Sequence, residues 1–254
     1  MRLLALTPLL CTLLLLGADP PPPPPPPPDA AGCVKVTVPT TDGLNLAADH
    51  CKAKQDGAPA VVLLHMIPPH HDRTNYPVEL RAALVEAGFE VLNLDRRGAG
   101  DSQGDPKEAY TGPKGKLDVQ AALDWLRSNS KADPERWACV GASNGTTSCL
   151  DYVAHTEAYE GTVPPRALVF LTGGPYTETQ TKLARTAVTH LPLLFVHDTK
   201  EAAWSEAQKQ VPHDGPWRWE HLEPGGHGTR AFAKHPELFA TLVGFLTEHL
   251  EPAR

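Results

Sequence analysis

The stretch CVGASNG at residues 139–145 is the most informative part of the sequence for the fold of this chain. It lies between an apolar run at 137–140, which predicts a strand, and a following segment that predicts a helix. A G-x-S-x-G pattern alone is weak evidence, because small residues recur in turns. At a strand-to-helix junction it indicates a sharp turn, in which Gly141 and Gly145 let the strand and the helix approach each other. We therefore expect Ser143 to be an exposed, strained nucleophile, with an ordinary loop serine as the alternative.

Apolar runs alternate with amphipathic segments along most of the chain. Continuous apolar runs predict strands that are covered on both faces, and one-sided apolar patterns predict helices. Strands are expected at 60–64, 89–94, 137–140, 167–171, 193–197 and 217–222, and helices at 78–87, 117–127, 202–210 and 236–249. This alternation predicts an α/β fold with a mostly parallel central sheet and helices on both faces.

A β-hairpin is predicted before this alternating region. Residues 34–50 contain an alternating apolar run, a turn signal and a returning run. A register that pairs Val38 with Leu46 is expected. The same register pairs Cys33 with Cys51 and brings their Cβ atoms within reach of a disulfide bond. We predict this bridge; lipid attachment at Cys33 is the alternative.

The N-terminal residues are typical of an export signal. Arg2 supplies a positive charge, residues 3–16 are apolar and rich in leucine, and residues 16–18 offer a cleavage site before Asp19. The apolar run is shorter than the about 20 residues that a membrane-spanning helix needs. We expect a signal peptide at 1–18 that is removed, no stable membrane span afterwards, and a secreted or periplasmic protein. An uncleaved anchor is the alternative.

A proline-rich segment follows this signal. Residues 20–28 are all proline, which lacks an amide donor and has a fixed φ, so this segment forms neither helix nor sheet. It is expected to be a polyproline II spacer or disordered filler. The predicted organisation is a signal peptide at 1–18, a linker at 19–32 and one catalytic domain at 33–254.

Composition limits the classes of function and the compartment. The formal net charge is −7 and no basic cluster stands out, so a nucleic-acid partner is not expected. Of the five cysteines, Cys11 leaves with the signal peptide, and the remaining even number suits an oxidising compartment. Cys139 and Cys149 lie on either side of Ser143 and form either a second bridge or two buried thiols.

The chain resembles the α/β-hydrolase family from Val34 onward. The resemblance is carried by LLHM at 63–66, LDRRGAGDS at 94–102, the turn around Ser143, LFVH at 194–197 and GGHG at 225–228, in matching order and spacing. Few residues separate the strands at 167–171 and 193–197, so no large cap domain is expected. In this respect the chain is similar to capless carboxylesterases, acyl-protein thioesterases and dienelactone-hydrolase-like proteins. The last group uses a cysteine nucleophile, whereas this chain has serine.

The resemblance also implies the partners of Ser143, which follow it in the order acid, histidine. A serine hydroxyl needs a base, and His227, between two glycines after the last strand, stands where the family places that base. The family often shows HGxxD where this chain has HDTKE at 197–201. Glu201 therefore takes the usual position of the acid, and Asp198 is its rival.

Two backbone N–H groups are expected to stabilise an oxyanion. One belongs to Asn144, directly after the nucleophile. The other is placed at Ile67, in the loop after the strand at 60–64. The family usually has glycine where Met66 stands, so this loop is expected to have a different shape, which leaves the second donor open.

These residues predict a serine hydrolase. His227 removes the proton of Ser143, the serine attacks a carbonyl, and water later releases the acid from the acyl-enzyme. A small-molecule carboxylic ester or thioester is the first expected substrate, a peptidase or lactonase comes next, and a non-catalytic binding protein is the alternative class. No cofactor is expected. The neighbouring His70, His71 and Asp72 are not expected to bind a metal, because no further ligand cluster supports them.

Overall fold

A mostly parallel sheet forms the centre of the fold. The computed structural model describes residues 27–110, 114–159, 161–182 and 186–250, so the expected signal peptide at 1–18 and residues 19–26 of the expected linker lie outside it. In the described residues, eight strands lie in the order β1-β2-β4-β3-β5-β6-β7-β8. The β1–β2 and β2–β4 pairs are antiparallel and the other pairs are parallel. The strands are β1 (Val34–Pro39), β2 (Asn45–Cys51), β3 (Ala60–Leu64), β4 (Glu90–Leu94), β5 (Trp137–Ala142), β6 (Ala167–Leu171), β7 (Leu193–Asp198) and β8 (Trp217–Leu222).

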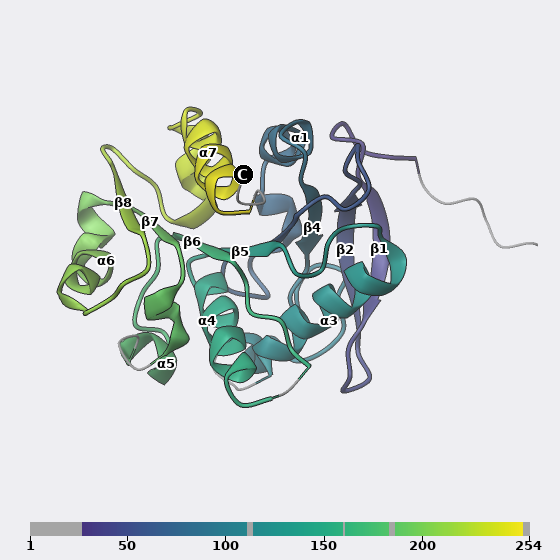
Figure 1. Cartoon of the computed structure of the whole chain (residues 1–254), viewed down its shortest axis with the longest axis horizontal. Coiled ribbons are helices and arrows are strands. Elements are labelled where there is room, and N and C mark those ends of the chain that lie inside the picture. The colour runs from purple at the N-terminus through teal and green to yellow at the C-terminus, as the bar shows by residue number, and fades with distance from the viewer. Residues whose placement is uncertain (1–26, 111–113, 160, 183–185, 251–254) are drawn as a thin grey trace, which may run out of the picture.

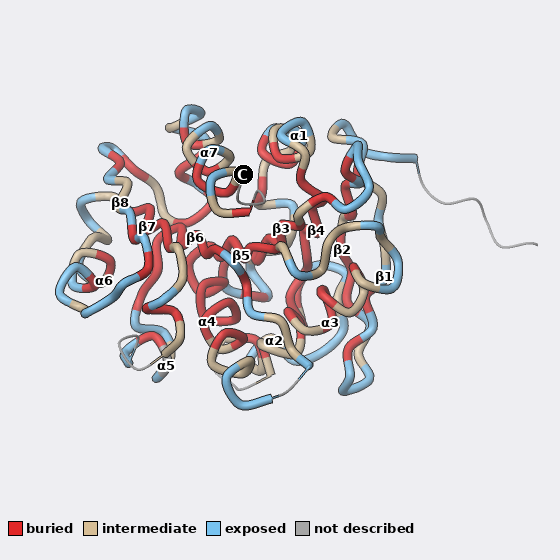
Figure 2. The backbone as a smooth tube through the Cα atoms, in the orientation of Figure 1, coloured by how far each residue is buried: buried red, intermediate tan, exposed pale blue. Residues whose placement is uncertain are grey.

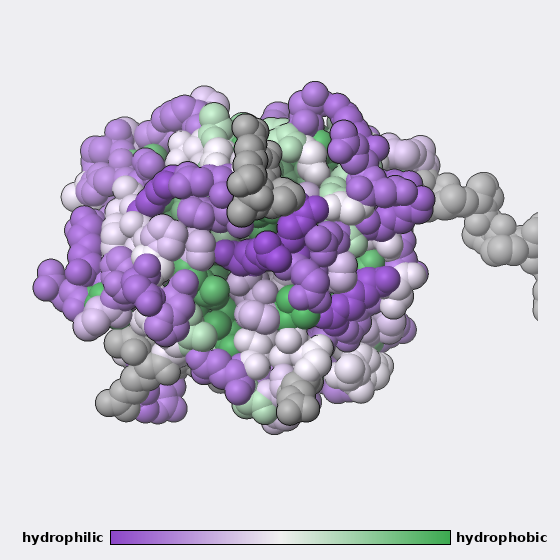
Figure 3. All heavy atoms as spheres, viewed as in Figure 1, coloured by the Kyte–Doolittle hydropathy of each residue, from purple (hydrophilic) through white to green (hydrophobic). Residues whose placement is uncertain are grey.

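Helices cover both faces of the sheet, as predicted (Figure 1). α1 (Val78–Glu86) and α7 (Leu238–Leu250) lie on one face, and α3 (Gly115–Asn129) and α4 (Gly145–Thr156) lie on the other. Each face has its own cluster of buried apolar side chains. The central strands β3 to β7 are buried almost throughout, whereas the edge strands β1 and β8 are partly exposed (Figure 2). Figure 3 shows that polar residues cover most of one side of the molecule, with hydrophobic residues in small patches.

The buried strands explain the continuous apolar runs in the sequence. All residues of β3, β4 and β6 are buried, because helices pack on both sides of them. The polar residues within β4 have partners: Glu90 Oε1 lies 2.6 Å from His50 Nε2, and Asn93 donates to the carbonyl of Arg73 at 2.8 Å. These bonds lower the cost of burying polar groups in a central strand.

The shorter elements differ from the predicted ones. The expected helix at 202–210 is divided into α6 (Ala202–Ala207) and a 3₁₀ turn at Gln208–Gln210. α2 (Pro106–Tyr110) and α5 (Glu178–Thr181) were not predicted, because segments this short carry no measurable apolar period. Between β6 and β7 the described residues hold α5 and a 3₁₀ turn at Ala187–His190, so they contain no large cap domain, as predicted.

Two disulfide bonds tie the secondary structure together. The hairpin has the predicted register, with Val38 opposite Leu46, and the predicted bridge joins Cys33 to Cys51. A second bridge joins Cys139 in β5 to Cys149 in α4, so the alternative of two buried thiols is wrong.

Two disulfide bonds suggest an extracellular or periplasmic protein. Among the described residues, no helix has both the length and the apolar character needed to cross a membrane.

The Cys33–Cys51 bridge is expected to contribute measurably to stability. Replacing both cysteines by alanine removes a cross-link across a sequence separation of 18 residues. The free energy of unfolding should fall by about 3 kcal/mol, because the unfolded chain regains conformational freedom. Urea unfolding of the variant and the wild type measures this difference. Thiol titration of the unfolded, unreduced wild type should detect neither cysteine; free thiols at both positions would contradict the bridge.

Candidate active site

Ser143 sits in a turn that only small neighbouring residues allow. It follows β5, precedes α4 and has a φ of 50°, a region that non-glycine residues seldom adopt. A Cβ atom on Gly141 would lie 2.6 Å from the amide nitrogen of Thr146, and one on Gly145 would collide with the carbonyl of Leu64 at the end of β3. The helix therefore begins in direct contact with the strand ends, and the serine is fixed between them.

Three side chains from separate segments form one chain of hydrogen bonds. Ser143 Oγ lies 2.6 Å from His227 Nε2, and His227 Nδ1 lies 2.8 Å from Glu201 Oε2. An ionised carboxylate can only accept a hydrogen bond, so the imidazole carries its proton on Nδ1 and Nε2 accepts from the serine hydroxyl. The structure thus brings together the serine, the acid and the histidine that the sequence analysis singled out.

Asp198, the rival acid, has a different set of contacts. Its carboxylate accepts a hydrogen bond from the backbone N–H of Glu201 at 3.0 Å, and it forms the N-terminal cap of the 3₁₀ turn at Thr199–Glu201. Capping of this kind satisfies a backbone donor that would otherwise lack a partner. Asp198 therefore holds the turn that presents Glu201, and Glu201 is the acid that contacts His227.

Thr172, which the sequence analysis missed, holds the loop that carries His227. Its hydroxyl accepts a hydrogen bond from the backbone N–H of Gly228 at 3.0 Å, and its own N–H donates to the carbonyl of Val196 at 2.7 Å. Thr172 has a φ of 58°, which is strained for a β-branched residue. A single threonine after a strand carries no sequence signal, so only its tertiary contacts reveal this role.

Tyr176 is a second residue that the sequence analysis missed. Its hydroxyl lies 3.3 Å from Ser143 Oγ and 3.5 Å from the carbonyl oxygen of Thr172. Burial raises the pKa of the Tyr176 phenol, so it stays protonated at neutral pH. The single phenol proton faces two acceptors, the carbonyl of Thr172 and Ser143 Oγ, whose own proton points to His227.

Both expected oxyanion donors lie in loops at the ends of strands. Asn144 directly follows Ser143 at the start of α4, and Ile67 follows β3, with 38% of its surface exposed. Neither backbone N–H has a hydrogen-bond acceptor among the described residues. Both amides are therefore available to a ligand, as an oxyanion site requires.

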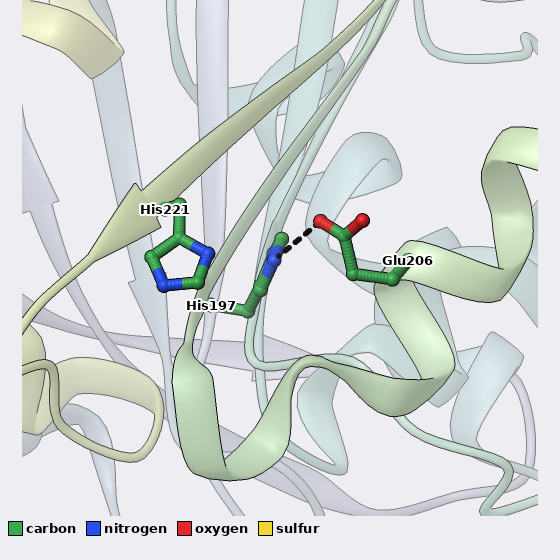
Figure 4. Close-up of side chains that lie close together, drawn as sticks. All are labelled: His197, Glu206 and His221. Atoms are coloured by element: carbon green, nitrogen blue, oxygen red, sulfur yellow. Dashed lines mark hydrogen bonds and ion pairs between the residues drawn. The ribbon is translucent and has the colours of Figure 1, made fainter.

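One group of residues in the described part of the chain has the composition of a metal site. His197 in β7, Glu206 in α6 and His221 in β8 offer ligand atoms within 4.8 Å of one another (Figure 4). His197 Nε2 lies 3.0 Å from Glu206 Oε1, but Lys209 also binds this carboxylate, at 2.7 Å. An entering cation would have to displace the ammonium group. The contacts seen here fasten α6 to β7, next to the turn that carries Glu201.

Comparison with protein families and curated proteins gives several partial matches. A family model described as X-Pro dipeptidyl-peptidase (S15 family) matches residues 42–169. An uncharacterized protein of Mycobacterium tuberculosis (strain H37Rv) is 31% identical over 160 residues, which are 63% of this chain and 50% of that protein. The human protein ABHD12B is 33% identical over 116 residues, 43% of this chain and 30% of that protein. The chain thus spans half or less of the length of these relatives.

Solved structures share the fold at low sequence identity. An esterase from Pyrococcus furiosus has a TM-score of 0.65 at 18% identity, covering 86% of this chain and 92% of that chain. A dienelactone hydrolase from Anabaena variabilis has a TM-score of 0.65 at 14% identity, covering 86% of this chain and 98% of that chain. An acylaminoacyl peptidase from Pyrococcus horikoshii has a TM-score of 0.62 at 16% identity, covering 87% of this chain and 42% of that chain.

Removal of the Thr172 hydroxyl should destabilise the protein. In Thr172→Val the N–H of Gly228 loses its buried acceptor, which should lower the free energy of unfolding by about 1–3 kcal/mol. Thr172→Ser keeps the acceptor and serves as the matched control. Urea unfolding compares the three proteins. Equal stability of the valine and serine variants would show that the hydroxyl does not hold this loop.

Proposed function

This chain belongs to the family described as X-Pro dipeptidyl-peptidase (S15 family), within the α/β hydrolases, and we propose that it cleaves a carboxylic ester or thioester through an acyl-enzyme on Ser143. Membership and fold make it a hydrolase of the α/β-hydrolase kind. The observation that carries the finer proposal is the chain of hydrogen bonds from Ser143 through His227 to Glu201.

The proposed reaction follows from this geometry. His227 Nε2 accepts the Ser143 proton while Oγ bonds to the substrate carbonyl carbon, whose oxygen becomes an oxyanion. The N–H groups of Asn144 and Ile67 stabilise that charge. The carbon–oxygen or carbon–sulfur bond to the leaving group then breaks, and the imidazolium returns its proton to this group. Water attacks the acyl-enzyme by the same steps, and Glu201 stabilises the imidazolium throughout.

A peptide substrate is the second candidate. It is favoured by the description of the matched family model and by the likeness to an acylaminoacyl peptidase. The matched residues 42–169 include Ser143 but end before Glu201 and His227, so the match speaks for the nucleophile turn and not for the whole site. The absence of a large cap among the described residues supports the ester assignment, since small esters need no enclosing domain.

We also propose that the chain is exported and that residues 1–18 are its signal peptide. The two disulfide bonds support this proposal, because such bonds persist in oxidising compartments. A small-molecule ester outside the cytoplasm is then the proposed partner of the site.

Ser143 should react covalently with a fluorophosphonate probe. The wild type should be labelled on the tryptic peptide that contains Ser143, and Ser143→Ala should not be labelled, because the probe needs an activated hydroxyl. Mass spectrometry locates the label. A folded wild type that takes up no probe would favour a non-catalytic binding protein. Parallel assays with 4-nitrophenyl acetate and Gly-Pro-4-nitroanilide separate an esterase from a peptidase.

Substitution of Glu201 should cause a large loss of activity, whereas substitution of Asp198 should not. Glu201→Gln removes the charge that stabilises the imidazolium, so kcat should fall on the order of 10⁴-fold. Asp198→Asn keeps an oxygen that can accept from the N–H of Glu201 and should stay close to the wild type. Hydrolysis of 4-nitrophenyl acetate measures both. A large loss in Asp198→Asn together with an active Glu201→Gln would assign the acid to Asp198 instead.

A further inference from the structure

Arg96, just after β4, is a buried cation that the proposed reaction does not use directly. Its side chain is fully buried, and burial lowers the pKa of Arg96 to about 10, so it remains charged at neutral pH. Its hydrogen-bond acceptors in the described structure are neutral: three backbone carbonyl groups, one amide oxygen and one hydroxyl. Burying a charge against neutral oxygens costs free energy, so a role beyond packing is expected.

One side of the guanidinium holds the peptide that contains Ile67. Arg96 Nη1 donates to the carbonyl of Met66 at 3.4 Å and to that of His65 at 3.5 Å. The His65 ring adds a bond: Nε2 accepts from the N–H of Arg96 at 2.9 Å, so Nδ1 carries the proton and donates to the Met66 carbonyl at 2.8 Å. The Met66 carbonyl and the Ile67 N–H belong to one planar peptide, so these bonds fix the direction of the N–H.

The same guanidinium holds the residue that provides the other donor. Arg96 Nη1 donates to Asn144 Oδ1 at 3.0 Å, and Nη2 donates to Ser148 Oγ at 3.0 Å in the first turns of α4. Asparagine at the start of a helix usually caps it with its side chain. Asn144 has helical backbone angles and makes no such bond; its amide oxygen accepts from Arg96. The position of this side chain restrains the backbone N–H of Asn144.

We propose that Arg96 is the positioning residue of the oxyanion site, where it sets the spacing and direction of the Ile67 and Asn144 N–H groups. The inference rests on the proposed function. A planar cation with several fixed donors can hold two loops in one geometry, whereas the donors of a flexible ammonium have no fixed directions. Donors on the Met66 carbonyl also polarise that peptide and strengthen its N–H as a donor.

Arg97 provides a matched control in the same turn. It is equally buried, but its side chain binds carboxylates, with Nε 2.8 Å from Asp118 Oδ1 and Nη1 2.8 Å from Asp42 Oδ2. These partners lie in α3 and in the β1–β2 turn. Arg97 thus stabilises the fold and does not contact either oxyanion loop.

The test compares 4-nitrophenyl acetate with its thionoester, whose sulfur accepts hydrogen bonds poorly in an oxyanion site. In Arg96→Lys, kcat for the ester should fall about 10–100-fold with KM nearly unchanged. The thionoester should lose much less, so the ester-to-thionoester ratio of kcat/KM falls. Arg97→Lys should lower the melting temperature but keep the wild-type ratio. An unchanged ratio in folded Arg96→Lys would overturn the proposal.

Two further variants, Asn144→Ala and Ser143→Ala, distinguish a failure of the Arg96 proposal from a failure of the proposed function. Asn144→Ala removes the acceptor and leaves the guanidinium in place; it should also lower the ratio, and it decides the question if Arg96→Lys does not fold. A normal ratio in Asn144→Ala would then count against the proposal. The wild type and Ser143→Ala test the proposed function itself: a wild type without serine-dependent hydrolysis would refute that function, and the role of Arg96 with it.

Discussion

The close contact between the start of α4 and the ends of β3 and β5 is the constraint on which the site depends. Because Gly145 has no side chain, the start of the helix packs directly against the carbonyl of Leu64, and Ser143 between them has a positive φ. A serine in this position costs conformational energy that the surrounding packing must offset. The parallel sheet supplies this packing, since β5 is buried along its whole length.

The sheet also determines which residues can meet the serine. Carboxyl ends of parallel strands share one edge, so the loops after β3, β5, β6, β7 and β8 converge although they are far apart in sequence. Ile67, Ser143, Thr172, Glu201 and His227 each follow a different one of these strands. The buried segment after β4 adds Arg96 from beneath, where its bonds to the loops after β3 and β5 link the two sides of the site.

Local patterns predicted what depends on period or fixed spacing. The strands, the hairpin register and the Cys33–Cys51 bridge follow from alternation and pairing. Ser143 was singled out by its turn motif, whereas Glu201 and His227 were implied by the resemblance to the α/β-hydrolase family. Thr172 and Tyr176 escaped prediction, because a lone threonine or tyrosine acts here only through contacts with distant segments. Arg96 appeared only within the LDRRGAGDS stretch at 94–102, since the direction of a buried side chain depends on the packed interior and not on the local sequence.

The Cys139–Cys149 bridge bears on the cellular compartment in which the disulfide-bonded protein can form. The bond closes a covalent ring through β5, the nucleophile turn and α4, with Ser143 inside it. A reducing cytoplasm does not favour such a bond, so a chain in that compartment would carry the turn without this cross-link. Under the export proposed above, the ring would close in the oxidising compartment. Formation of this cross-link and export of the protein would then be coupled through one pair of sulfur atoms.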